Sequence, residues 1–165
     1  MHYILAFALL TTAVLAGIPP QYYSFSPPVG SGSGQPYTIT GEGRITAIRV
    51  WEANSNYIQG LQVCYNGIWS PTVGYAYNGA KELQLFDNEV IVQVSGKYSH
   101  YVQWLVFVTN RGRSLFAGQP SGLSFNMYPS HEQAELRFIS GRLHGALTSI
   151  GAHWAVFTSN STGDH

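Results

Sequence analysis

Short runs in which apolar and polar residues alternate dominate the chain from about residue 45 onward. Five of these runs read ITAIRVW, IQGLQVCY, VIVQVSG, YVQWLVFVT and LRFISG. Alternation with period two, enriched in β-branched and aromatic residues, predicts strands, and the Gly, Asn and Pro between the runs predict turns. Apolar residues spaced by three and four never persist for two helical turns, so we expect an all-β protein.

Three segments of the chain match one another without gaps: RVWEANSNYIQGLQV, QVSGKYSHYVQWLVF and FISGRLHGALTSIGAH. The match pairs equivalent apolar residues at Val50, Val94 and Ile139, and again at Leu61, Leu105 and Ile150. The two positions are separated by 11 residues in every segment. Chance similarity among hairpins explains this constant spacing less well than a threefold repeat does. One such unit cannot bury its apolar face alone, whereas three units around an axis can.

The two ends of the chain differ from the repeats. Residues 1–16, MHYILAFALLTTAVLA, are almost wholly apolar, too short for a comfortable membrane span, and broken at once by Gly-Ile-Pro-Pro. We interpret them as a secretory signal peptide and expect no membrane span; the alternative is an apolar N-terminal strand. One domain is expected over residues 17–157, followed by a polar tail over 158–165. The Asn160-Ser161-Thr162 sequon in this tail is a candidate glycosylation site in an exported protein.

Charge and cysteine content narrow the classes of partner. Eight Lys and Arg residues balance eight Asp and Glu residues, giving a formal net charge of zero. This balance argues against nucleic acid, which binds through excess basic charge, and disfavours anionic glycosaminoglycans. The single cysteine, Cys64, precludes an internal disulfide, so the domain must depend on its apolar core. We expect Cys64 to be packed on a strand; an intermolecular disulfide is the alternative.

No motif for catalysis or for a cofactor is present. The sequence lacks His-Glu-x-x-His, Gly-x-x-x-x-Gly-Lys and Gly-x-Ser-x-Gly. Its only two aspartates are Asp87 and Asp164, and its histidines do not have metal-ligand spacing. We therefore expect a binding protein and not an enzyme, with no cofactor and no metal ion.

An ordered series of short motifs runs through the chain: Gly30–Gly34, Ile45–Val50, Gly60–Val63, Gln93–Tyr98, Leu105–Thr109, Arg111–Arg113, Gly122–Asn126, Arg137–Arg142 and Ile150–Trp154. With the threefold repeat, this series resembles the jacalin-related lectins, in particular the secreted animal type known as zymogen granule 16. The resemblance covers roughly residues 29–157. It implies a β-prism of three Greek-key-like four-stranded units with pseudo-threefold symmetry.

The resemblance also implies a sugar site made by three loops. The first is the Gly-rich loop, here Gly32, Ser33 and Gly34, which offers a backbone N–H to the sugar. The middle loop modulates specificity and corresponds to Arg111 and Arg113. From the residues alone, a flexible connector is the favoured interpretation of the Gly-rich loop, and a plain hairpin turn explains the middle loop about as well as a binding loop does.

The third loop carries the family pattern Gly-x-x-x-Asp, which in this chain falls on Gly151, Ala152, His153, Trp154 and Ala155. Ala155 stands where the family has an aspartate that accepts two sugar hydroxyls. Each such charge-assisted bond contributes about 1.5–3 kcal/mol, so its loss weakens a monosaccharide site severely. Ile150 and Trp154 are expected to lie mainly in the core.

The function implied is that of a secreted, metal-independent carbohydrate-binding protein with weakened or altered mannose-type recognition. Its partners would be glycans or glycoproteins, and the remodelled site could use Arg111, Arg113, Tyr37 or His153. The alternative is a β-prism module that has lost sugar binding and acts through a protein partner or a homo-oligomer.

Overall fold

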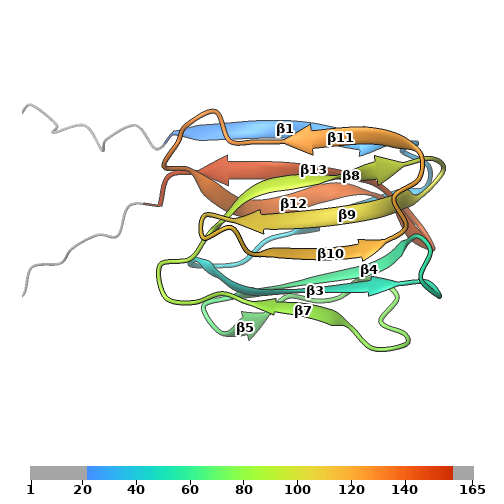
Figure 1. Ribbon diagram of the computed structural model, residues 1–165, viewed down its shortest axis with the longest axis horizontal. Helices are drawn as coiled ribbons and strands as arrows, with labels where there is room; N and C mark the ends of the chain where they lie inside the picture. The colour runs from blue at the N-terminus through green and yellow to red at the C-terminus, as the bar shows by residue number, and fades with distance from the viewer. Residues whose placement is uncertain (1–21, 158–165) are drawn as a thin grey trace, which may run out of the picture.

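The computed structural model describes residues 22–157, which form strands and turns and no helix (Figure 1). The strands are β1 (Tyr23–Gly30), β2 (Gln35–Ile39), β3 (Ile45–Glu52), β4 (Ile58–Tyr65), β5 (Ile68–Trp69), β6 (Val73–Gly74), β7 (Lys81–Gln84), β8 (Ile91–Tyr98), β9 (Val102–Thr109), β10 (Ser114–Gly118), β11 (Leu123–Met127), β12 (Glu135–His144) and β13 (Ala146–Ala155). The all-β expectation is confirmed.

The strands form three antiparallel sheets, with the orders β1-β13-β12-β2, β5-β4-β3-β7 and β10-β9-β8-β11. In the last of these, β8, β9 and β10 follow one another and β11 returns beside β8, which is a Greek key. The β3 sheet repeats this order, but two short strands, β5 and β6, both pair with β4. The remaining sheet has the same order when β12 and β13 are followed by β1 and β2. The expected β-prism is therefore confirmed, with one five-stranded unit.

The repeat found in the sequence corresponds to the central hairpin of each sheet: β3–β4, β8–β9 and β12–β13. Val50 is the direct cross-strand partner of Leu61 in the first hairpin. In the other two hairpins, Leu105 and Ile150 instead face glycines, Gly96 and Gly141. The units are thus alike in strand order and burial, with a local change of register in the first.

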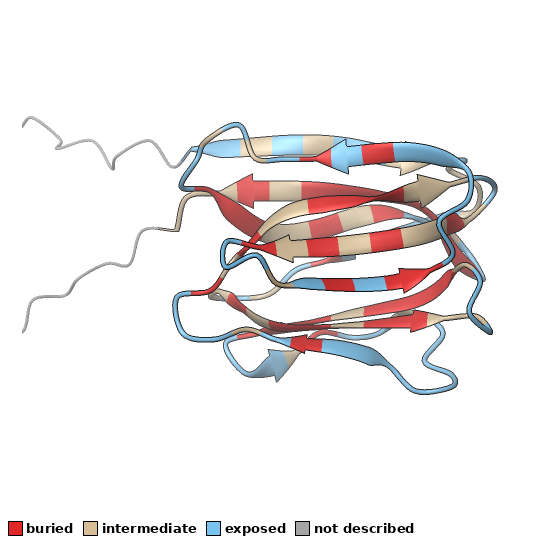
Figure 2. Cartoon of the chain, viewed as in Figure 1, coloured by how far each residue is buried: buried red, intermediate tan, exposed pale blue. Residues whose placement is uncertain are grey.

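One apolar core lies between the three sheets, as the buried stripes along their strands show in Figure 2. The largest fully buried side chains come from all three sheets: Trp154, Phe107, Ile39, Ile48, Ile58, Leu61, Ile91, Leu105, Leu136, Ile139, Leu147 and Ile150. Each side chain of this size contributes about 1.5–3 kcal/mol when fully buried. Cys64 is also buried, as a free thiol on β4.

Because consecutive strands run in opposite directions, the turns collect at the two ends of the prism (Figure 1). The Gly-loop end holds residues 30–34, 53–57, 99–101 and 145, and the far end holds residues 40–44, 66–67, 85–90 and 110–113. The predicted signal peptide, the polar tail and Asn160 lie outside the described residues.

No helix capable of spanning a membrane occurs between residues 22 and 157.

Candidate functional site

The Gly-rich loop, residues 30–34, lies directly against the hairpin formed by β12 and β13. A Cβ atom on Gly30 would lie 2.0 Å from the carbonyl oxygen of Thr148, and one on Gly34 would lie 2.0 Å from that of Leu143. Gly32 between them has a φ of +71°, and a Cβ atom there would meet nothing closer than 3.9 Å. The loop is therefore clamped at both ends and open at its crest, which is the arrangement that a close-approaching ligand requires.

Side chains fix this loop to its neighbours. The Thr148 hydroxyl donates to the Ser33 carbonyl at 2.5 Å, and the Arg142 guanidinium donates to the Gly34 carbonyl at 2.7 Å. Ser31 donates to the main-chain carbonyl of His100, in the turn between β8 and β9, at 2.6 Å. The loop is an ordered part of the Gly-loop end, and the reading of it as a flexible connector is wrong.

Two main-chain donors of the loop remain available. Among residues 22–157, no hydrogen bond is made by the N–H groups of Ser33 and Gly34. The N–H of Gly32 makes a long bond, 3.4 Å, to the carbonyl of Thr148. The predicted contribution of backbone N–H groups thus has a structural basis at Ser33 and Gly34.

Aromatic and imidazole rings lie at the same end of the prism as the loop. Tyr57 and Tyr101 stack with their ring centroids 4.6 Å apart, and the His100 ring meets Tyr101 edge-on. Tyr75 lies 3.7 Å from where a Cβ atom on Gly145 would be, beside the exposed side chain of His144. Such rings offer an apolar face together with a polar edge, which suits a ligand with both kinds of surface.

Sequence reasoning missed the residues that meet the Gly-rich loop: His100, Arg142, Leu143, His144 and Thr148. The repeat could have identified the turns to which these residues belong or lie close, because each turn joins the two strands of a repeated hairpin. Turns at equivalent positions in a threefold repeat lie at the same end of the fold.

The expectation that Gly151–Ala155 forms a loop is wrong, because all five residues belong to β13. This strand lies between β1 and β12 and pairs with both, so its N–H groups serve the sheet. Ala152 and Trp154 have no exposed surface, and the Trp154 indole donates to the Ser26 hydroxyl at 3.0 Å. The core role expected for Ile150 and Trp154 is confirmed.

His153 lies on the outer face of the same sheet, half-buried beneath Phe25. Its Nε2 atom is hydrogen-bonded to the Ser140 hydroxyl at 2.9 Å, and its Nδ1 atom to the Tyr23 hydroxyl. Burial lowers the pKa of the imidazole, which favours the neutral ring. Tyr37, a further candidate, is buried in the core and donates to the Ser149 carbonyl at 3.0 Å. Neither side chain lies on the Gly-rich loop.

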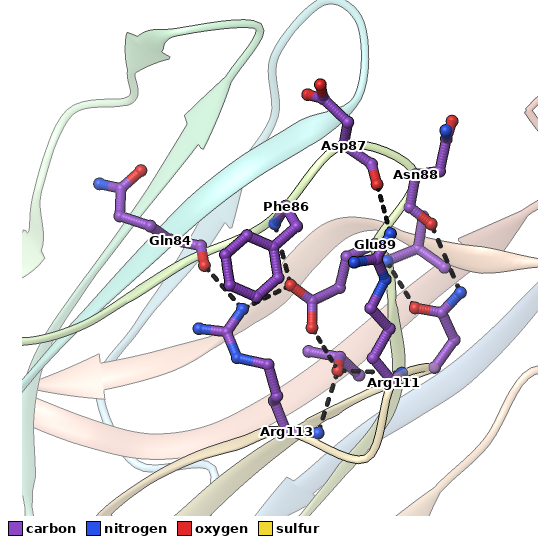
Figure 3. A network of polar contacts seen from close by, with 10 residues as sticks. Gln84, Phe86, Asp87, Asn88, Glu89, Arg111 and Arg113 are labelled. Atoms are coloured by element: carbon purple, nitrogen blue, oxygen red, sulfur yellow. Dashed lines mark hydrogen bonds and ion pairs between the residues drawn. The ribbon is translucent and has the colours of Figure 1, made fainter.

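Arg111 and Arg113 lie at the far end, in the turn between β9 and β10, and not beside the Gly-rich loop. Both guanidinium groups are used within the chain (Figure 3). Arg111 donates to the Asp87 carbonyl at 2.8 Å, while Arg113 forms an ion pair of 2.5 Å with Glu89. Their placement in one sugar site with Gly32–Gly34 is therefore wrong; they hold the loop of residues 85–90.

Glu89 is the centre of this second network. Its side chain has no exposed surface, and it accepts from the Phe86 N–H at 2.9 Å and from the Thr109 hydroxyl at 2.7 Å, in addition to Arg113. Burial alone would raise the pKa of Glu89, but these three donors outweigh it and lower the pKa below its ordinary value. The carboxylate therefore remains charged at neutral pH and fixes the loop.

No cluster of three or more His, Cys, Asp or Glu side chains that could hold a metal ion occurs within residues 22–157.

The three-sheet fold and the ordered Gly-rich loop together define one class of binding protein. Comparison with known proteins identifies this class. Residues 26–153 match the Jacalin-like lectin domain, and the chain belongs to this family. It is 42% identical to the human protein called zymogen granule membrane protein 16, over 92% of this chain and 98% of that protein.

Solved structures agree with the family assignment. The crystal structure of a prostate-specific WGA16 glycoprotein lectin has a TM-score of 0.70 and 30% identity, covering 79% of this chain and 97% of that one. A mannose-binding lectin from Champedak has a TM-score of 0.67 and 25% identity, covering 80% and 96%. The family and these neighbours are lectins, a class defined by carbohydrate binding and not by catalysis.

Proposed function

We propose that this chain is a secreted, metal-independent carbohydrate-binding protein whose saccharide site lies at the Gly-loop end. One observation carries the proposal: the clamped loop of residues 30–34 leaves the crest at Gly32 open, with unused N–H groups at Ser33 and Gly34. Two N–H donors on a rigid main chain can bind one sugar hydroxyl without a cost of ordering the loop. The rings of Tyr75, beside Gly145, and Tyr101, stacked on Tyr57, lie at the same end of the prism and could supply an apolar contact to the sugar.

Mannose-type recognition at this site is weakened or altered. The three segments that meet there, residues 30–34, 99–101 and 142–149, contain no Asp or Glu. Sugar hydroxyls in this site would donate to neutral acceptors, at about 0.5–1.5 kcal/mol per bond instead of about 1.5–3 kcal/mol. The reason is thus the absence of an acid from these three segments, and not the identity of residue 155.

The test uses the full chain and a substitution on the crest of the loop. Gly32→Ala places a methyl group where a ligand must approach, so we expect saccharide affinity to fall at least about tenfold on a glycan array and in calorimetric titration. Gly112→Ala is the matched control, because Gly112 has a φ of +74° with nothing within 4 Å, at the far end. Equal affinities for the two variants would contradict the proposal.

The absence of an acid also favours a second candidate, a β-prism interaction module without sugar affinity. A glycan array on which the unmodified chain binds no saccharide, together with specific retention of one protein from a secretion, would support this candidate. Binding that is lost only in Gly32→Ala would exclude it.

Secretion is supported by the apolar leader and by the family relative named for the zymogen granule membrane. Expression of the full chain in a secreting cell line, followed by N-terminal sequencing, tests this point. A product that begins at Gly17 in the medium is expected, and retention of the uncleaved chain inside the cells would contradict it.

A further inference from the structure

A second hollow lies at the far end of the prism, away from the Gly-rich loop. Its volume is about 390 Å³, and it is lined by residues 43–46, Asn66, residues 85–89 and Phe157. This volume lies within the range of about 300–1,000 Å³ typical of small-molecule sites. None of the lining residues belongs to the Gly-loop end.

One wall of the hollow is a rigid loop. Glu89, Arg111 and Arg113 hold the main chain of residues 85–90 through the network shown in Figure 3. The side chains of Asp87 and Asn88 point away from this network. Within residues 22–157, no hydrogen bond or ion pair engages the Asp87 carboxylate. A charged acceptor is thus presented on a fixed main chain, which lowers the entropic cost of binding.

Another part of the lining offers donors. Arg44 donates hydrogen bonds from its Nε and Nη2 atoms to the buried carboxylate of Glu135, at 3.0 Å and 2.6 Å. Its guanidinium lies 4.9 Å from the centre of the Phe157 ring. The Nη1 group of Arg44 makes no hydrogen bond to any residue between 22 and 157, so it remains available to a ligand.

The balance of charge indicates what kind of ligand fits. Arg44 is paired with Glu135 and Arg113 with Glu89. Arg111 donates to the main-chain carbonyl of Asp87, and Arg137 lies over the Phe157 ring. These four arginines and the three carboxylates nearly balance in charge. The hollow therefore favours neither a polyanion nor a polycation. It combines carboxylate, amide and guanidinium groups with two apolar rings, those of Phe86 and Phe157. Uncharged sugars have the matching surface, with hydroxyls at their edges and C–H groups on their faces.

We propose that this hollow is a second saccharide-binding site, which takes the terminal one or two residues of an uncharged glycan. Asp87 accepts hydroxyl hydrogen bonds, Arg44 donates one, and Phe86 and Phe157 contact the sugar face. This site does not depend on the Gly-rich loop. With one site at each end, a single copy of the chain joins two glycans.

The experiment is a titration of the full, isotope-labelled chain, followed through its backbone amide NMR signals. The probes are methyl α-mannoside, methyl β-galactoside, N-acetylglucosamine and maltose, with N-acetylneuraminic acid as the charged comparison. At least one neutral probe should shift the signals of residues 43–46 and 85–89. Asp87→Asn should weaken that response at least about tenfold, since it removes the charged acceptor at constant size. Glu132→Gln changes an exposed carboxylate at the same end that does not line the hollow, so it should leave the response intact.

Any other outcome would contradict the proposal of a second site. It is wrong if no neutral probe shifts residues 43–46 and 85–89, if only N-acetylneuraminic acid shifts them, or if Asp87→Asn responds like Glu132→Gln. The two saccharide proposals are separable in the same data. Shifts confined to residues 31–34 would support the Gly-loop site and reject the far-end site, while shifts at the far end that persist in Gly32→Ala would support the far-end site by itself.

Discussion

The buried carboxylate of Glu89 provides a sharp test of how the far end is held together. Glu89→Gln keeps the size of the side chain but removes its charge from three bonds, to the Phe86 N–H, the Thr109 hydroxyl and the Arg113 guanidinium. A charged acceptor adds about 1 kcal/mol to each bond relative to a neutral one. Arg113 has 35% of its side chain exposed, so solvent screens part of its share. The expected loss is about 2–3 kcal/mol, or roughly 4–12 °C in melting temperature for a chain of this size.

Urea unfolding followed by tryptophan fluorescence measures this loss. Glu82→Gln is the control, since Glu82 pairs with Arg49 on the surface and should cost less than about 1 kcal/mol. The difference should also depend on pH. Because the pKa of Glu89 lies below its ordinary value of 4.5, the charged side chain stabilises the fold above that pH and ceases to do so as the pH falls through the lowered pKa. A loss that equals that of Glu82→Gln, or that is unchanged in acid, would refute the reasoning.

Two further predictions concern residues of β13. Ala155→Asp should leave saccharide affinity at the Gly-loop end unchanged, because Ala155 is separated from Thr148 by seven residues of strand, about 23 Å. Calorimetric titration measures this, and a tenfold gain in mannose affinity would restore the sequence-based assignment. Acidification from about pH 7 to about pH 5 should reduce the stability of the unmodified chain more than it reduces the stability of the His153→Gln variant. Burial lowers the pKa of His153, so the fold favours the neutral ring and loses stability as the pH falls through the ordinary value of 6.5; parallel melting curves would contradict this.

The architecture could be predicted because it rests on periodic features of the sequence. Alternation identified the strands, and the equivalent positions of Val50, Val94 and Ile139 identified three hairpins that bury their apolar faces together. The Gly-rich loop was predicted correctly as a loop, but its neighbours were not. Which loops lie beside the Gly-rich loop depends on the end of the prism at which each strand terminates. Consecutive strands run in opposite directions, so an error of one strand moves a loop to the other end.

The first of two errors in the predicted sugar site has this origin, and the second comes from overlooked alternation. The turn that carries Arg111 follows β9, one strand beyond the turn of His100, so it returns to the far end. The run Gly151–Ala155 was read as a loop although Ile150, Ala152 and Trp154 alternate as a strand does, and the structure follows the alternation. The contact between Glu89 and Arg113 left no local signal, because the two residues lie in different turns and meet only through the folding of the sheet.

The sheet that supports the Gly-rich loop is assembled from both ends of the described chain. β1 pairs with β13, so Tyr23 lies opposite Ala155, and β2 pairs with β12. During synthesis this sheet cannot close until its last strand has left the ribosome, while the other two can form earlier. Such non-local pairing makes folding slow. Because the first and last strands are neighbours, a short linker could join them and new termini could be opened at the turn of Gly112. A circular permutant of this kind would keep the three sheets but would place β9 and β10 at opposite ends of the new chain, so that the sheet of β8–β11 would become the one closed last.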